Sequence, residues 1–205
     1  MKGRGVLIVH RSSFIVQTME IEVKFALKDR SALVRKLNDI GAQQLYAETF
    51  EDNIVLDRRG ELRTRGALLR VRKFGRYALA TFKGPMAFEG GVKMREEVQT
   101  GVESFELAIQ LFDSLGFKPV FRYQKYREVW RVRDVEVVLD RTPIGHYFEI
   151  EGPLEVIRAV AEELGMNMEA GIRQSYADLY RQHRRTRADL PENMVFAPEQ
   201  LPSST

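Results

Sequence analysis

Two carboxylates and one ammonium group alternate near the start of the chain, in the pattern Glu20-x-Glu22-x-Lys24. Side chains alternate across a β-strand, so these three charges would share one face, and the apolar Ile21 and Val23 would lie on the other. Carboxylates hold cations, and ammonium groups hold anionic oxygens. A strand face of this composition suits a ligand that is itself highly charged.

The same division into a charged and an apolar face recurs in later segments. Leu69-Arg70-Val71-Arg72 alternates apolar and basic residues, and Lys83 follows Phe82. The other charged faces contain Lys93, Arg95 and Glu97, then Lys125, Arg127 and Arg131, then Glu136 and Asp140, and finally Glu149 and Glu151. One such face is usually a solvated surface. Because mixed signs recur, we interpret the set as strands that curl around a wet tunnel, suited to a metal-polyphosphate complex.

The elements that must carry these charges follow an order typical of an α+β fold with a large antiparallel sheet. Helix patterns cover residues 29–40, 104–115, 154–164 and 172–187. Strand patterns cover residues 19–25, 43–57, 67–74, 77–83, 92–99, 117–132, 135–140 and 147–151. We expect residues 58–66 to form a turn and Gly84-Pro85 to end the strand before it.

The length of 205 residues fits one domain with tails. We interpret residues 1–18 as an N-terminal extension, with Met19 as an alternative start, and residues 19–182 as the domain. Residues 183–205 form a polar C-terminal tail that is expected to trail off after Asp189.

Composition narrows the classes of protein further. No run of 18 apolar residues exists, which predicts no membrane span, and cysteine is absent, which fits a cytoplasmic location. With 32 basic and 29 acidic residues, the net charge is only +3, so the placement of charge is more informative than its sum. The basic run 181–187 is a weak nucleic-acid signal, because no nucleic-acid-binding motif accompanies it. We therefore expect no nucleic-acid partner.

The ordered motifs resemble the CYTH superfamily, which is named for class IV adenylyl cyclase and thiamine triphosphatase. The resemblance covers about residues 19–180. It rests on Glu20-x-Glu22-x-Lys24, Leu69-Arg70-Val71-Arg72, Thr81-Phe82-Lys83-Gly84-Pro85, Arg95-Glu96-Glu97, Lys125-Tyr126-Arg127, Asp140 and Glu149-Ile150-Glu151. The terminal Ser175-Tyr176-Ala177-Asp178-Leu179 is similar to the end of the class IV adenylyl cyclase branch.

This resemblance implies an antiparallel eight-stranded β-barrel with flanking helices, forming a triphosphate tunnel that works with Mg²⁺ or Mn²⁺. The residues implied to contact phosphate are Lys24, Arg70, Arg72, Lys83, Arg95, Lys125 and Arg127, with Lys24, Arg70, Arg72, Lys83 and Arg127 also catalytic. The residues implied to hold metal are Glu20, Glu22, Asp140, Glu149 and Glu151. Glu97 and Arg173 are further candidates.

Three functions stay open at this point. A class IV adenylyl cyclase would convert ATP to cyclic AMP and pyrophosphate, and a triphosphatase would hydrolyse inorganic triphosphate or an organic one such as thiamine triphosphate. A module that only binds triphosphates or nucleotides is the third. In each case the partner is ATP or another small molecule bearing a triphosphate, and a homodimer is a candidate assembly.

Overall fold

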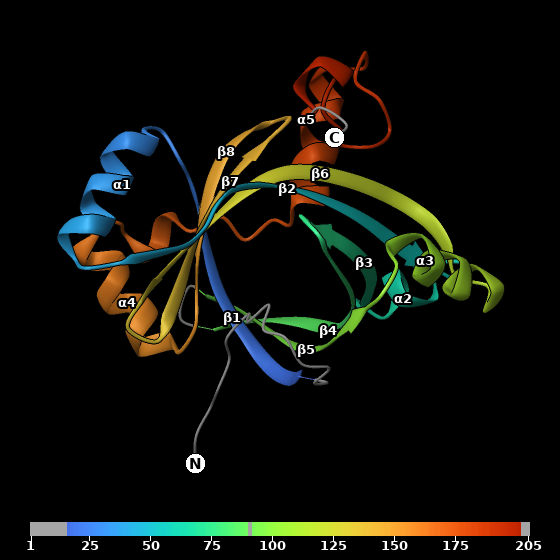
Figure 1. Ribbon diagram of the computed structural model, residues 1–205, viewed down its shortest axis with the longest axis horizontal. Coiled ribbons are helices and arrows are strands. Elements are labelled where there is room, and N and C mark those ends of the chain that lie inside the picture. The colour runs from blue at the N-terminus through green and yellow to red at the C-terminus, as the bar shows by residue number, and fades with distance from the viewer. Residues whose placement is uncertain (1–15, 90–91, 202–205) are drawn as a thin grey trace.

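The computed structural model describes residues 16–89 and 92–201, and within them eight antiparallel strands close into a barrel (Figure 1). The strands are β1 (Val16–Ala26), β2 (Gln43–Asp57), β3 (Leu68–Phe74), β4 (Tyr77–Glu89), β5 (Val92–Val102), β6 (Lys118–Val132), β7 (Val135–Thr142) and β8 (Gly145–Glu151). Around the barrel they follow the order β1-β5-β4-β3-β2-β6-β7-β8. The predicted α+β class and antiparallel eight-stranded barrel are confirmed.

Helices flank the barrel on three sides (Figure 1). They are α1 (Arg30–Asp39), α2 (Glu61–Thr64), α3 (Phe105–Ser114), α4 (Leu154–Glu163) and α5 (Tyr176–Thr186), with short 3₁₀ turns at Met168–Ala170 and Pro198–Gln200. In Figure 1, α1 and α4 share one flank, α2 and α3 lie at the opposite end, and α5 stands apart from both pairs. No helix in the described part of the chain has the length and apolar character needed to cross a bilayer.

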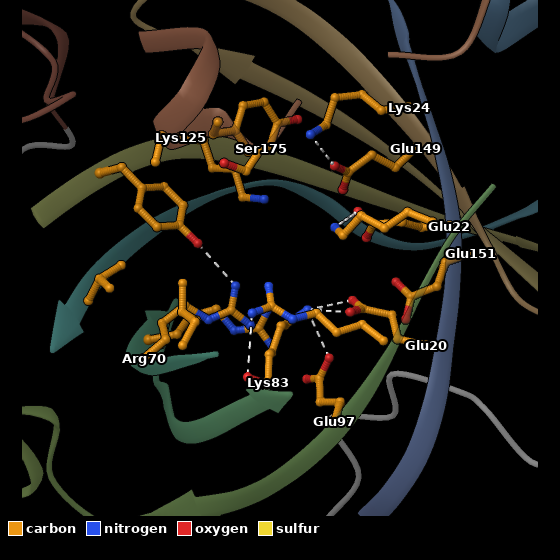
Figure 2. Close-up of a pocket in the computed structure, with 18 of the residues that line it drawn as sticks. Glu20, Glu22, Lys24, Arg70, Lys83, Glu97, Lys125, Glu149, Glu151 and Ser175 are labelled. Atoms are coloured by element: carbon orange, nitrogen blue, oxygen red, sulfur yellow. Dashed lines mark hydrogen bonds and ion pairs between the residues drawn. The ribbon is translucent and has the colours of Figure 1, made fainter. Parts of the chain in front are cut away.

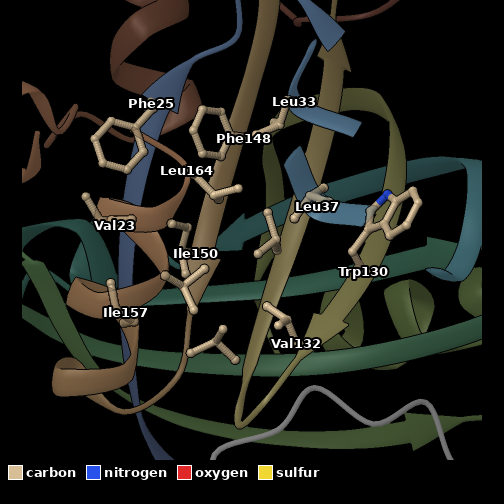
Figure 3. Packing of buried hydrophobic residues seen from close by; sticks show 14 of the residues in the cluster. Val23, Phe25, Leu33, Leu37, Trp130, Val132, Phe148, Ile150, Ile157 and Leu164 are labelled. Carbon is tan, nitrogen blue, oxygen red and sulfur yellow. The ribbon is translucent and has the colours of Figure 1, made fainter. Parts of the chain in front are cut away.

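The main hydrophobic core lies outside the barrel, between the outer faces of its strands and the flanking helices. Phe25 and Phe148 stack at 5.2 Å between ring centroids, and Leu37 of α1 and Ile157 of α4 pack into the same cluster with no exposed surface (Figure 3). Burying each such side chain contributes about 1.5–3 kcal/mol. Where helices cover the barrel, the apolar faces of its strands are therefore used for packing, and the opposite faces are left for the barrel interior.

Helix α1 begins where the sequence predicts, at the Asp29 N-cap, whose side chain accepts a hydrogen bond from the Ala32 backbone N–H at 2.9 Å. Because Asp29→Ala leaves that N–H unpaired, we expect it to lower the free energy of unfolding by about 1 kcal/mol. The control Asp39→Ala removes the same charge from the other end of α1 and should be near neutral. Urea denaturation of both variants measures the difference, and equal losses would contradict the capping role.

Two local expectations are wrong. The expected turn at residues 58–66 contains the short helix α2, whose Leu62 and Arg63 backbone N–H groups donate to the Asp57 carboxylate. Strand β4 does not end at Gly84-Pro85 but continues to Glu89, with a register shift between Lys83 and Met86. A bulge at this point accommodates proline, which has no N–H to donate to the ladder.

The expectation that the chain trails off after Asp189 is also wrong for the described residues. Met194 is fully buried and Phe196 nearly so, and the Tyr180 hydroxyl donates to the carbonyl oxygens of Pro191 and Asn193 at 2.7 and 3.0 Å. Apolar side chains within a polar segment were sufficient to hold it against the barrel. At the other end, residues 16–18 belong to β1, and residues 1–15 of the predicted extension lie outside the described part.

Candidate active site

The barrel interior contains a cavity of about 110 Å³ lined mostly by charged side chains (Figure 2). All the predicted site residues line it except Asp140 and Arg173. Antiparallel register brings them together: Glu20 lies opposite Arg95 of β5, and Lys24 lies opposite Glu149 of β8. Strand alternation puts these side chains on the inner face, and barrel closure makes that face continuous.

Basic side chains form a large part of the cavity wall and are nearly all buried. Arg70 donates to the Tyr123 hydroxyl at 3.0 Å, and Arg72 donates to the Gln99 side chain at 3.0 Å. The Nε atoms of both arginines are buried without a hydrogen-bond partner. Burial and the nearby charge of Arg70 lower the pKa of Arg72. Crowded cations with unused donors form a cradle that an anion would stabilise.

Arg127 is the centre of a buried ion network on β6, β7 and β8. Its guanidinium donates to both Asp140 oxygens at 2.7 and 2.6 Å and to Glu149 at 2.7 Å. Asp140 also accepts from Lys125 at 3.0 Å and from the Tyr176 hydroxyl at 2.7 Å. With its oxygens occupied and only 1% of its surface exposed, Asp140 supports the cavity wall from behind rather than lining it.

Four carboxylates gather at one side of the cavity, opposite Arg70 (Figure 2). These are Glu20, Glu22, Glu97 and Glu151. Lys83 pairs with Glu20 at 2.5 Å and with Glu97 at 2.8 Å, and Lys93 pairs with Glu22. Within the described part of the chain, the Glu151 carboxylate has no ion pair or hydrogen bond. Burial and the charges of Glu20 and Glu97 raise the pKa of Glu151 well above its ordinary value.

These carboxylates fit a divalent cation by donor type, because carboxylate oxygens are the ligands that hard ions such as Mg²⁺ and Mn²⁺ prefer. Among the described residues, however, no three acidic or histidine side chains are already arranged as a metal site. Binding would require the carboxylates now held by Lys83 and Lys93 to turn toward the ion.

Two predicted residues lie apart from the main cavity. Asp140 is behind its wall, as described above. Arg173 borders a small neighbouring pocket with Glu22, Lys24 and Lys93, and its guanidinium lies 5.9 Å from the centre of the Phe88 ring.

The structure adds four residues that the candidate set lacked. Lys93, Tyr123 and Tyr176 line the cavity, and Tyr176 places its ring 4.1 Å from the Lys24 ammonium. Glu51 is fully buried beneath the cavity floor, 3.4 Å from Lys125 and 3.7 Å from Arg72. Although burial disfavours its charged form, Lys125 and Arg72 hold the pKa of Glu51 well below its usual range. Lys93 shares the alternating face of Arg95 and Glu97, a signal that was available in the sequence.

Known proteins share this fold and part of this sequence. A protein of Methanocaldococcus jannaschii named "putative adenylate cyclase" is 28% identical over 175 residues, covering 78% of this chain and 98% of its own length. A solved structure of a "putative adenylate cyclase" from Vibrio parahaemolyticus has a TM-score of 0.71 at 19% identity, covering 80% of this chain and 98% of that one.

A second solved structure is the "putative adenylyl cyclase" of Hippeastrum, which shows a dominant triphosphatase activity. It has a TM-score of 0.61 at 17% identity and covers 80% of this chain and 96% of its own. At these identities the two structures support the fold alone. The CYTH domain model matches residues 18–176, which contain every residue that lines the charged cavity except Ala177. The chain therefore belongs to the CYTH domain family.

Proposed function

We propose that this protein binds a triphosphate chain inside its barrel and breaks one of its phosphoanhydride bonds with the help of Mg²⁺ or Mn²⁺. The observation that carries the proposal is the cavity itself, in which buried cations with unused donors face a group of carboxylates. Phosphoryl transfer needs positioning and charge neutralisation more than covalent help from the protein. A cradle of fixed cations supplies both.

The residues divide into two roles in this proposal. Arg70, Arg72, Lys24 and Lys125 bind and orient the nonbridging phosphate oxygens, and Arg127 holds the adjoining wall in place. Glu20, Glu22 and Glu151 would hold the divalent ion, which supplies charge neutralisation at the phosphate when bound. Asp140 and Glu149 already share Arg127, and each has a lysine partner as well, so we assign them to positioning of the basic residues rather than to metal binding.

Two reactions fit this cradle. In cyclisation, the ribose 3′-hydroxyl of ATP attacks the α-phosphorus, forming cyclic AMP as pyrophosphate leaves. The M. jannaschii relative, which is named for this activity, favours it. In hydrolysis, a water attacks the terminal phosphorus, the bond to the bridging oxygen breaks, and the diphosphate part of the substrate leaves as the terminal phosphoryl group becomes orthophosphate. The lining of the cavity supports this reaction, because most of the side chains that line it are charged and the cations among them suit a phosphate chain.

One assay separates the reactions. The purified chain is incubated with ATP, inorganic triphosphate or thiamine triphosphate, each with Mg²⁺ or Mn²⁺. Cyclic AMP with pyrophosphate identifies a cyclase, and orthophosphate identifies a triphosphatase. Tight binding without any product identifies a binding module and contradicts the proposed turnover.

Arg72→Ala tests the cradle by binding alone. Because Arg72 is a buried guanidinium on the cavity wall, its loss should weaken inorganic triphosphate binding by about tenfold or more. Orthophosphate, which can use the remaining cations, should be affected much less. The control Arg76→Ala changes a guanidinium that donates to Tyr77 on the exposed surface and should leave both affinities unchanged. Titration calorimetry measures them, and equal losses for both ligands would argue against a polyphosphate cradle.

A further inference from the structure

Part of β6 is left without a neighbour on one side of the barrel. Pairing between β6 and β7 begins at Tyr126 opposite Arg141, whereas β6 itself starts at Lys118 and pairs with β2 along that first half. The backbone from Arg122 to Gln124 therefore has an open edge facing the C-terminal part of the chain. An open strand edge presents unpaired N–H and C=O groups that another segment can satisfy.

Residues Pro191–Phe196, which we call the strap, occupy this edge. The Gln124 backbone N–H donates to the Met194 carbonyl at 2.8 Å, and the Met194 N–H donates to the Arg122 carbonyl at 3.0 Å. Two hydrogen bonds from backbone N–H groups to side chains also join the strap to β6. The Arg122 N–H donates to Asn193 Oδ1 at 2.8 Å, and the Phe196 N–H donates to Gln124 Oε1 at 3.1 Å. The strap thus forms an isolated parallel β-bridge with β6, between Met194 and Tyr123.

The strap also packs against residues that line the cavity. Fully buried Met194 belongs to one apolar cluster with Tyr123, Tyr176 and Tyr180. Tyr123 is the residue that Met194 pairs with on β6, and its hydroxyl accepts the hydrogen bond from Arg70. A continuous chain of contacts therefore runs from the strap through the Tyr123 ring to a guanidinium of the cradle.

The strap lies outside the part of the chain that defines the family. The CYTH domain model ends at residue 176, and the strap begins at residue 191. Its contacts with Arg122, Tyr123 and Gln124 nevertheless reach into a strand that the model covers. An element beyond the family domain is therefore built into one wall of the cavity.

We propose that the strap is a positioning element for Arg70, and that it acts through Tyr123. This inference rests on the proposed function, because it assigns a role to Arg70 in holding the triphosphate. Packing in the cluster that contains Met194 fixes the position of the Tyr123 ring. The Tyr123 hydroxyl then holds the Arg70 guanidinium toward the open cavity. Without that hydrogen bond, Arg70 is free to turn toward the buried carboxylates of Glu97 and Glu51, and is then lost to the ligand.

The electrostatic surroundings of Arg70 agree with this competition. Burial works against its charged form, but Tyr123, Glu97 and Glu51 outweigh burial and raise the pKa of Arg70. The Tyr123 hydroxyl accepts a hydrogen bond from Arg70 and so fixes the direction of the guanidinium, whereas contact with the Glu97 or Glu51 carboxylate would pair its positive charge.

A double-mutant cycle in the full-length chain tests the connection. Tyr123→Phe keeps the ring and removes the hydroxyl, and we expect it to weaken inorganic triphosphate binding by about tenfold with little change in thermal midpoint. Met194→Ala should weaken binding severalfold. If both act on Arg70 by one route, Met194→Ala should have almost no further effect in the Tyr123→Phe background. Titration calorimetry of the four proteins supplies the affinities.

The control is Ile157→Ala on α4, which deletes a fully buried apolar side chain that is not in the cluster of Tyr123 and Met194. It should lower the thermal midpoint and leave the affinity unchanged. Additive losses in the cycle, or an affinity loss in Ile157→Ala, would overturn the positioning role. If Met194→Ala does not fold, the Tyr123→Phe variant is sufficient for the test. An unchanged affinity of this variant for inorganic triphosphate would overturn the positioning role. Absence of triphosphate binding by the parent chain would instead reject the proposed function.

Discussion

Arg127→Ala is expected to lower the free energy of unfolding by about 3 kcal/mol and to reduce turnover by about 10²-fold or more. The substitution leaves Asp140 and Glu149 buried with one fewer cation, and uncompensated buried charge is strongly destabilising. The expected decrease in the free energy of unfolding is at the lower end of the range for broken buried ion pairs. The reason is that Lys125 and Tyr176 still contact Asp140, and Lys24 still contacts Glu149. Urea denaturation and phosphate release measure the two effects.

The matched control for Arg127→Ala is Arg181→Ala, which removes an arginine from a surface pair with Asp178 at 2.9 Å. Surface pairs contribute about 0–1 kcal/mol, so this variant should stay close to the parent in stability and turnover. If Arg127→Ala lowers the free energy of unfolding no more than Arg181→Ala does, water reaches Asp140 and Glu149. The buried network then does not hold the cavity wall.

Glu151→Gln is expected to abolish most metal-dependent turnover, by about 10²-fold or more, while the folded protein becomes no less stable. The Glu151 carboxylate lies among like charges without a partner, so a neutral amide relieves repulsion. Its raised pKa also fixes the sign of the pH effect: the parent loses stability as pH rises from the ordinary glutamate range toward the raised pKa. The free energy of unfolding of Glu151→Gln, relative to the parent, should therefore increase as the pH rises through this interval.

Glu136→Gln is the control for Glu151→Gln. Burial also raises the pKa of Glu136, but this carboxylate pairs with Arg131 and does not line the cavity. It should keep normal turnover across a Mg²⁺ titration. Unchanged turnover in Glu151→Gln at every Mg²⁺ concentration would remove Glu151 from the proposed metal set.

Alternation alone predicted which face of each strand carries charge, because side-chain direction has a period of two residues. The pattern around Glu20 therefore placed this residue on the cavity wall, together with Arg70 and Glu149. Alternation within one strand does not predict which residues of neighbouring strands lie opposite each other. That register decides which charged side chains come into contact. The bidentate contact between Arg127 and Asp140, which places Asp140 behind the wall, depends on the pairing of β6 with β7.

The C-terminal segment shows a different limit of sequence reasoning. Its prolines and polar residues are typical of a tail, and its apolar residues, Met194 and Phe196 among them, show no periodic pattern. What orders them is an unpaired edge on β6, about 70 residues earlier in the chain, which is visible only after the barrel closes. Tyr123 shares the alternating face of Lys125 and Arg127, so its place on the cavity wall could have been predicted, whereas the place of Tyr176 on α5 depends on how that helix packs against the barrel.

The separation of the apolar core from the barrel interior has a consequence for divergence within such a fold. Leu37 and Ile157, which supply packing energy, belong to the cluster outside the barrel and are not among the residues that line the cavity. Substitutions on the inner wall can therefore accumulate while the outer packing preserves the architecture. A lineage built this way can change what its cavity binds without first finding a new way to fold.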